Sequence, residues 1–327
     1  MEDITVVVAG DEGIAPGLFA TIGSVAVSCN KGRRLDVHCL DTGLLAGTRQ
    51  TLTQYVGQFG NVCLVMHSVD LSPFKDATPM RGGYSSYARI LFRRYVKSKR
   101  ILYLDADFLV MKDVSVLFDM DMKGYSACAT TTPTIPYLKQ DCPFFVPEEV
   151  EGIPYFNAGI LLIDAERWDR EACERRIIEK LKMGKRLRYH DQTLLNYVLK
   201  GRWKRLDDSW GLMMIHNTDN PLNTNYHFGG GRKPWQFGAT FIATGLWWVF
   251  YEVRIQKYFP LANAKLLKRR FVRNERLVYY CLPLVSWFLC VIPCLRGKVL
   301  RMCERRKYYK IFRDAEVQAR NLWGTLV

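Results

Sequence analysis

The first 66 residues alternate between short apolar runs and stretches with helical periodicity, and this alternation limits the folds open to the chain. The runs 4–10, 35–40 and 62–66 are rich in Val, Leu and Ile, so each predicts a buried β-strand. The segments 18–28 and 47–59 between them are typical of helices. Strands that alternate with helices pair in parallel and carry helices on both faces of the sheet. We therefore expect an α/β fold with a mostly parallel sheet.

The alternation continues in the middle of the chain. An apolar run at 100–104 predicts a fourth strand near the centre of the sheet. The segment 130–154 contains five prolines and little periodicity, which predicts a surface loop of a length that is more often functional than connecting. The other expected elements are a strand at 156–163 and helices at 84–96, 167–183 and 192–199.

Charge is distributed unevenly. The formal net charge is +15, and residues 262–327 contain 15 Lys or Arg against four acidic residues, so the first 261 residues are almost balanced. Cations confined to one end of a chain indicate an anionic surface, either a membrane or a nucleic acid, as the target. We divide the chain into a catalytic α/β domain, 1–261, and a basic, apolar, helical tail, 262–327.

The ten cysteines form no disulfide or zinc pattern. Cys39, Cys63 and Cys128 lie in apolar, strand-like runs, where a thiol packs as a small hydrophobic group, and no C-x-x-C pair occurs. The chain passes from Met1 directly into a strand, without a basic and apolar export signal. These features predict a reducing, cytoplasmic location.

Two aspartates end the fourth expected strand. Asp105 and Asp107 are spaced by two, so both side chains can point the same way from the strand's C-terminal end. Open α/β sheets bind ligands at that edge, and two adjacent carboxylates are stabilised by a divalent cation such as Mn²⁺ or Mg²⁺. On this short pattern alone, a pair of solvated turn aspartates is the alternative.

Residues 227–235 have the composition of a loop that binds metal and phosphate. The imidazole of His227 can supply a third ligand to a cation held by two carboxylates. Three consecutive glycines allow backbone N–H groups to approach phosphate oxygens, and Lys233 adds a positive charge. The alternative is a flexible, basic turn with an exposed histidine.

Five separated blocks of the sequence, in order, resemble glycosyltransferase family 8, and specifically the bacterial galactosyl- and glucosyltransferases that build lipopolysaccharide cores. The resemblance extends from residue 4 to about residue 236. The blocks lie at 8–11, 87–89, 103–107, 156–163, and 190–192 together with 227–235. The family implies a GT-A fold, which is a Rossmann-like nucleotide-binding architecture, and retaining transfer of a hexose from a UDP-sugar.

The resemblance also assigns roles to residues at the metal and the diphosphate. It places the divalent cation, Mn²⁺ with Mg²⁺ as the alternative, on Asp105, Asp107 and His227. It places Lys233 and Gly230 at the diphosphate.

Uracil and ribose are assigned by the resemblance to Ala9 and Asp11. A carboxylate that accepts from uracil N–H or ribose hydroxyls suits this role, whereas a turn aspartate that caps the next helix is the alternative. The pair 13–14 is Gly-Ile, where relatives carry a polar residue and a Tyr that stacks on the base. The resemblance therefore leaves open what stacks on uracil.

The donor sugar is assigned to Arg89, Asn157 and Asp191, and Gln192 is placed beneath the anomeric carbon. A surface arginine, a turn asparagine and a first-turn helix acid are the respective alternatives. Double displacement requires a carboxylate within bonding reach of the anomeric carbon. Asp191 is the nearby candidate and is assigned to sugar binding, so we favour front-face attack, in which the leaving diphosphate accepts the proton of the acceptor.

The tail contains 19 uncharged residues at 277–295, long enough to span a bilayer by length alone. Pro283 and Pro293 interrupt this run and both flanks are basic, whereas the positive-inside bias is one-sided. A monotopic or re-entrant segment, flanked by cations on anionic headgroups, fits better. A helix packed on the rest of the protein is the alternative.

The sequence thus predicts a retaining hexosyltransferase that uses UDP-galactose or UDP-glucose and acts on a lipid-linked or lipopolysaccharide-core saccharide at the inner face of a membrane. A family 8 transferase with a soluble polyol or glucan acceptor is one alternative, and a catalytically silent nucleotide-sugar-binding protein is another. The uncharged run inside the basic tail argues against nucleic acid as a partner.

Overall fold

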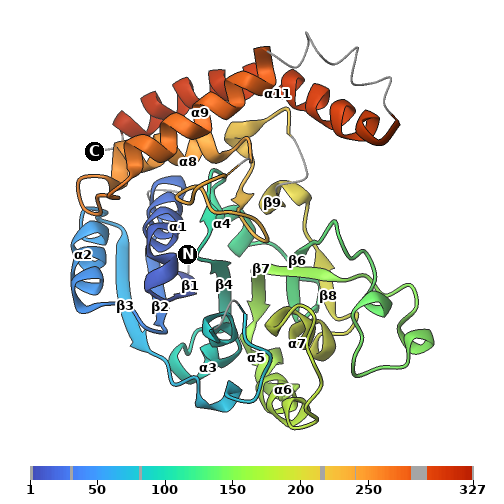
Figure 1. The fold of residues 1–327 in the computed structure, drawn as a ribbon. Helices are drawn as coiled ribbons and strands as arrows, with labels where there is room; N and C mark the ends of the chain where they lie inside the picture. The colour runs from blue at the N-terminus through green and yellow to red at the C-terminus, as the bar shows by residue number, and fades with distance from the viewer. Residues whose placement is uncertain are drawn as a thin grey trace.

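The computed structural model describes residues 3–29, 32–80, 83–213, 218–239, 241–280 and 293–325. Seven strands of these residues form the main sheet, in the order β3-β2-β1-β4-β7-β6-β8. The strands are β1 (Ile4–Gly10), β2 (Leu35–Asp41), β3 (Val62–Ser68), β4 (Arg100–Asp105), β6 (Ala127–Thr131), β7 (Phe156–Asp164) and β8 (Trp203–Arg205). The expected α/β class, and the central position of β4, are confirmed (Figure 1).

The sheet is parallel except around one strand. β1 pairs in parallel with β2 and β4, β2 with β3, and β6 with β8. β7 is antiparallel to both of its neighbours, β4 and β6. In the register of the central pair, Ala9 of β1 lies opposite Asp105 of β4. The carboxyl ends of β1 and β4 therefore meet at the same edge of the sheet.

Helices cover both faces of the sheet. α1 (Ala15–Ser28), α2 (Ala46–Val56) and α4 (Val114–Phe118) pack on the face that contains Val6 and Val8. The 3₁₀-helix Ser85–Leu91, α3 (Phe92–Tyr95), α5 (Ala165–Arg170), α6 (Cys173–Leu181) and α7 (Asp191–Val198) cover the face that contains Val7 and Ala9. Alternating residues of β1 thus supply both cores, which explains why all seven are buried.

Two expected helices differ from the structure. The segment 84–96 forms a 3₁₀-helix followed by one α-helical turn, and its residues 87–92 are all buried, so packing on every side decides its geometry. The expected helix at 167–183 is divided into α5 and α6, because Ala172 between them has a left-handed backbone conformation with φ of +50°. The expected loop at 130–154 begins two residues inside β6 and contains two short 3₁₀ turns.

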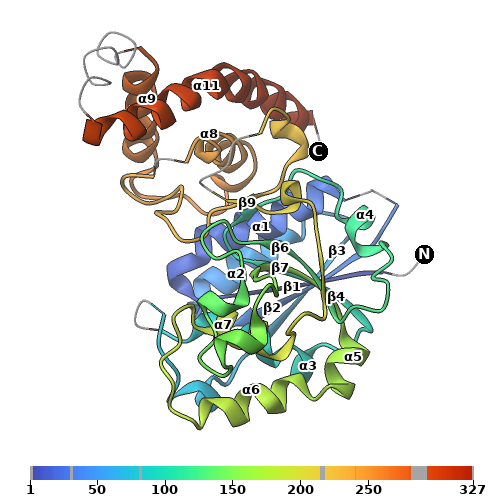
Figure 2. The same cartoon turned by 90° about the vertical axis from the view of Figure 1, so that its right-hand side faces the viewer.

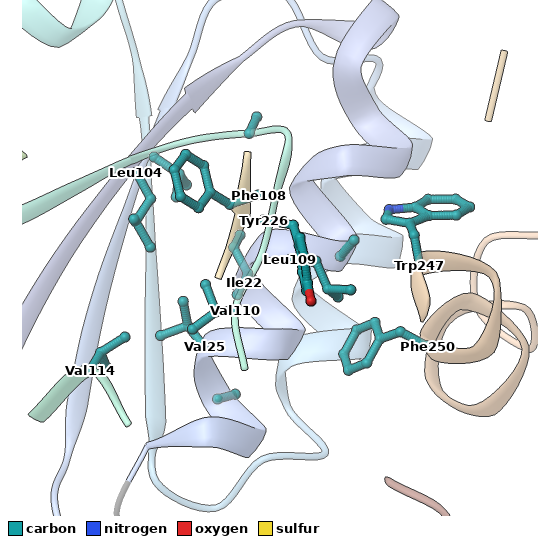
Figure 3. Close-up of a cluster of buried hydrophobic side chains, with 14 of the residues drawn as sticks. Ile22, Val25, Leu104, Phe108, Leu109, Val110, Val114, Tyr226, Trp247 and Phe250 are labelled. Atoms are coloured by element: carbon teal, nitrogen blue, oxygen red, sulfur yellow. The ribbon is translucent and has the colours of Figure 1, made fainter. Parts of the chain in front are cut away.

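A small second sheet connects the loop after β4 with the glycine-rich segment. β5 (Phe108–Leu109) and β9 (Leu212–Met213) flank β10 (Tyr226–His227), and His227 lies opposite Phe108. Figure 3 shows Phe108, Leu109 and Tyr226 within the cluster of buried side chains that also contains Ile22 of α1. This sheet therefore anchors His227 to the main core.

The described part of the tail packs on the rest of the protein. α8 (Thr244–Phe250) lies beneath α9 (Ala264–Tyr280) and α11 (Pro293–Thr325), as Figure 2 shows. The ring of Trp323 lies 4.9 Å from that of Phe250, and Glu252 forms ion pairs with Lys268 and Arg320. A boundary at 261 stays a prediction.

Among the described helices, none is long and apolar enough to cross a membrane. Most of the uncharged run at 277–295 lies outside the described residues.

Candidate active site

A cleft of about 490 Å³ opens at the edge of the sheet where β1 and β4 end. Its lining includes six of the residues singled out in the sequence: Ala9, Asp11, Arg89, Asp105, Asp107 and Lys233. The parallel register of β1 and β4 places Ala9 and Asp105 side by side at the ends of their strands. The position agrees with the rule that open α/β sheets bind ligands beyond the carboxyl ends of their strands.

Three side chains converge on one point beside this cleft. Nε2 of His227 lies 3.4 Å from Oδ2 of Asp105 and 3.3 Å from Oδ1 of Asp107, and one ligand atom from each residue lies within 4.8 Å of the others. Oδ1 of Asp107 is buried and has no hydrogen-bond partner among the described residues. Two carboxylates and an imidazole suit a divalent cation of the Mn²⁺ type, and a bound cation would give this buried oxygen a partner.

Two glycines and a phenylalanine fix the imidazole of His227. A Cβ atom at Gly159 would lie 2.3 Å from Cε1 of the ring, and one at Gly229 would lie 2.7 Å from the same atom. The ring of Phe108 stacks on the imidazole with a centroid distance of 4.6 Å. The backbone N–H of Phe228 donates to the backbone carbonyl of Asp107 over 2.9 Å, which ties the two metal-ligand segments together.

Two buried cations balance the carboxylates. Lys233 forms an ion pair with Asp107 and also donates to the backbone carbonyl of Phe228 over 2.8 Å. Arg89 bridges two acids, with Nη2 at 2.7 Å from Asp105 and Nε at 2.8 Å from Asp191. The interpretation of Arg89 as one more surface arginine is wrong, because only 8% of it is exposed.

These charges shift the pKa values of the site. Burial alone would raise the pKa of both Asp105 and Asp107, but Arg89 holds the first below its ordinary value and Lys233 holds the second well below it. Burial would lower the pKa of His227, yet the two aspartates raise it to about 9. Burial dominates at Asp191 and raises its pKa despite Arg89. In the absence of a cation, the carboxylates of Asp105 and Asp107 therefore stay ionised and hold a proton on His227.

Of the residues assigned to the sugar, Arg89 lines the cleft, whereas Asn157, Asp191 and Gln192 lie next to it and not on the lining. The backbone N–H of Ala158 and Nδ2 of Asn157 donate to Oε1 of Gln192 over 3.0 and 3.4 Å. Oδ1 of Asn157 accepts from the N–H of Gly159, whose missing Cβ makes room for His227. Arg89 also donates to the carbonyl of Ala158 over 2.5 Å. Hydrogen bonds of Gln192 thus connect the start of α7 with the start of β7.

At the end of β1, Asp11 both caps the 3₁₀-helix Glu12–Ile14 and lines the cleft. Its Oδ1 accepts from the N–H of Gly13 over 3.0 Å, and its Oδ2 accepts from the hydroxyl of Ser85 over 2.5 Å. The capping alternative is therefore correct, and it leaves the carboxylate on the cleft wall. Gly230 is exposed with φ of +74° and does not line the cleft.

Sequence reasoning missed several residues of the cleft wall. Tyr103 resembles an ordinary strand residue, but its hydroxyl donates to Asp105 over 3.0 Å and Arg89 lies over its ring. Gln236 lies beyond the segment that we singled out, and its side-chain oxygen accepts from the N–H of Lys233 over 3.0 Å. The position of Tyr103, two residues before Asp105 and so on the same face of the strand, was a signal that could have identified it.

The family model and two curated relatives that match this chain are described as glycosyltransferases. The family model described as glycosyl transferase family 8 matches residues 5–239. The glycosyltransferase GlyF of Streptococcus pneumoniae is 29% identical over 182 residues, which cover 52% of this chain and 42% of GlyF. The lipopolysaccharide 1,3-galactosyltransferase of Salmonella typhimurium is 25% identical over 242 residues, or 69% of this chain and 71% of that enzyme. The match thus spans less than half of GlyF and most of the second relative.

Among solved structures, the galactosyltransferase LgtC in complex with donor and acceptor sugar analogues superposes with a TM-score of 0.62 at 24% sequence identity. The superposition covers 75% of this chain and 94% of LgtC. At this identity the likeness concerns the fold, which is therefore of the GT-A type.

Proposed function

The chain belongs to glycosyltransferase family 8, and on that premise we propose that it transfers galactose or glucose from a UDP-sugar to a saccharide acceptor, with retention of anomeric configuration. The observation that carries the proposal is the convergence of Asp105, Asp107 and His227 at the mouth of the cleft. The donor set fits Mn²⁺, with Mg²⁺ as the alternative. A bound cation would supply positive charge for the diphosphate that leaves the sugar.

Lys233 would stabilise charge on the leaving diphosphate, and Arg89 would position the donor sugar. Lys233 pairs with Asp107 and lines the cleft, so it can turn its ammonium group to the leaving diphosphate without crossing the protein. Ala9, Asp11 and the segment around Gly230 would hold the nucleoside and the diphosphate. Arg89, between Asp105 and Asp191, would fix the donor sugar relative to the metal ligands.

The surroundings of Asp191 and Gln192 support front-face attack. Asp191 is engaged by Arg89, so it is better placed to orient sugar hydroxyls, with Asn157, than to form a covalent sugar ester. The amide oxygen of Gln192 accepts from the backbone N–H of Ala158, which holds the side chain at the start of β7. We propose that the anomeric carbon lies above this side chain. The proton of the acceptor hydroxyl would pass to an oxygen of the departing diphosphate.

We propose a lipid-linked or lipopolysaccharide-core saccharide as the acceptor, at the cytoplasmic face of a membrane. The Salmonella relative acts on lipopolysaccharide by its name, and residues 262–327 are strongly basic. Each cation near an anionic surface contributes about 1 kcal/mol to binding at physiological salt. Peripheral attachment requires no spanning helix.

Donor hydrolysis tests the proposal without the acceptor. The full chain is incubated with a panel of UDP-sugars and Mn²⁺, and released UDP is measured with and without excess chelator. We expect hydrolysis of UDP-galactose or UDP-glucose that stops when the chelator is added. Hydrolysis of no UDP-sugar, with UDP binding retained, would instead favour a catalytically silent binding protein. Salt-resistant binding to anionic vesicles, absent for a transferase with a soluble acceptor, separates the two acceptor classes.

A further inference from the structure

A second pocket, of about 250 Å³, lies between the end of the glycine-rich segment and α9. Its lining includes Gln236, Phe237, Arg270, Phe271 and Arg273, and none of its lining residues is acidic. Gln236 also lines the donor cleft, so the two cavities share this residue.

Arg270 and Arg273 give this pocket its charge. Neither forms an ion pair within the described part of the chain, although nearby Lys268 is paired with Glu252. The guanidinium of Arg270 lies 4.3 Å over the ring of Phe237. Stacking of this kind holds the guanidinium plane in place and leaves its N–H groups at the edge free to bind an oxyanion.

The wall opposite α9 is a fixed turn. Gln236 accepts from the N–H of Lys233 through its side chain and donates its own N–H to the carbonyl of Lys233 over 2.9 Å. Arg232 donates to the carbonyl of Phe237 over 3.0 Å. The same turn therefore sets the position of Lys233 in the donor cleft and of Phe237 in the second pocket.

We propose that this pocket is an anion subsite that binds a phosphate group of the acceptor. Arg270 and Arg273 lie three residues apart on α9 and line one pocket, so together they supply the charge that binds a phosphate. The shared Gln236 places the subsite next to the sugar-transfer cleft. The assignment to the acceptor rests on the proposed transferase function, whereas phosphate binding by the two arginines does not. A lipid headgroup phosphate would offer the same chemistry from another source, and the test distinguishes the two.

The test uses the full chain in detergent micelles with UDP and Mg²⁺ at saturation, so that the donor cleft is occupied. Inorganic phosphate is then titrated by calorimetry at low salt. We expect saturable binding by the wild type and about tenfold weaker binding by each of the single variants Arg270→Gln and Arg273→Gln, because charge-assisted hydrogen bonds are lost. Arg269→Gln is the matched control, since it removes the same charge from an exposed neighbour that does not line the pocket.

Absence of phosphate binding by the wild type would overturn the proposal, and so would an equal loss in Arg269→Gln. Sedimentation with vesicles of phosphatidylcholine and phosphatidylglycerol forms the second arm. A loss confined to vesicle binding, and equal for all three arginines, would mean that α9 senses diffuse membrane charge and that the pocket is not an anion subsite. A loss of vesicle binding confined to the Arg270 and Arg273 variants would assign the pocket to a lipid headgroup phosphate and overturn the assignment to the acceptor. UDP-sugar hydrolysis by each variant reports separately on the proposed function, so its failure in the wild type would leave the phosphate result standing.

Discussion

Gly159→Ala should displace His227 and thereby weaken the metal site. The added Cβ would lie 2.3 Å from Cε1, 2.7 Å from Nδ1 and 2.8 Å from Nε2 of the imidazole. Ordinary contacts of this kind begin near 3.4 Å, so the ring must move by roughly 1 Å. Phe108 stacks on the ring and limits its retreat. A shift of that size exceeds the tolerance of metal–ligand bonds of about 0.2 Å several times over.

Misplacement of a site group by about 1 Å can cost about 100-fold in rate, and we expect a loss of that order in Mn²⁺-dependent hydrolysis of the UDP-sugar. Mn²⁺ affinity, measured by calorimetry, should fall in parallel. Overpacking should also lower the free energy of unfolding by about 1–3 kcal/mol, so thermal melts in chelator are recorded first. Gly47→Ala makes the same chemical change in α2, where nothing lies within 4 Å of the new Cβ. This variant should leave donor hydrolysis and Mn²⁺ affinity unchanged.

A double-mutant cycle identifies the cause. His227→Ala removes the ring that the new methyl group would strike, so Gly159→Ala should have almost no further effect in that background. Wild-type Mn²⁺ affinity in Gly159→Ala would refute the reasoning. Equal losses with and without the imidazole would show that the glycine acts through β7 and not through His227.

Four further outcomes are expected. Asp105→Ala or Asp107→Ala should abolish transfer with the fold intact, as judged by circular dichroism; full wild-type activity in excess chelator would contradict a metal role. The product should carry an α-linkage, and a β-coupled anomeric proton in its NMR spectrum would exclude retention. Replacement of residues 277–295 by a short Gly-Ser linker, in an otherwise full chain, should abolish salt-resistant vesicle binding and keep donor hydrolysis; continued pelleting after high-salt washing would place the membrane contact elsewhere. Nδ1 of His38 lies 2.9 Å from Nε2 of His67, and burial lowers the pKa of both histidines below 6.5. The unfolded chain then binds more protons than the folded chain, so stability should fall as pH drops below about 6.5. A melting temperature that depends equally on pH in His38→Gln would reject this pair as the cause.

The first half of the sheet could be predicted from the sequence, because each of its strands is an apolar run followed by a helix. The reversal at β7 could not. All but the last residue of Phe156–Asp164 are buried, and an apolar strand covered on both faces has the same composition in either direction. Its direction depends on the connection through 132–155, whose prolines predict a loop and carry no information on where the loop leads.

The candidate site was also only partly predictable from the sequence. Asp105 and Asp107 are recognisable because a strand ends at them, and strand ends gather ligands. Arg89 is not distinguishable by composition from Arg93 and Arg94, yet those two pair with the partly exposed acids Asp169 and Glu174 while Arg89 is buried between two site carboxylates. A single sequence lacks the long-range contacts that separate them, and only the family resemblance pointed to Arg89.

The packing of α11 has a consequence for how the chain is made. Trp323 and Phe312 belong to the same buried cluster as Ile4 and Leu18, and Trp323 contacts Phe250, which is synthesised 73 residues earlier. At about 5–20 residues per second, a ribosome needs about 4–15 s to cover that distance. During this interval the apolar surface of α8 is uncovered while the donor cleft can already assemble, so a nascent chain is exposed to aggregation after its site residues are complete.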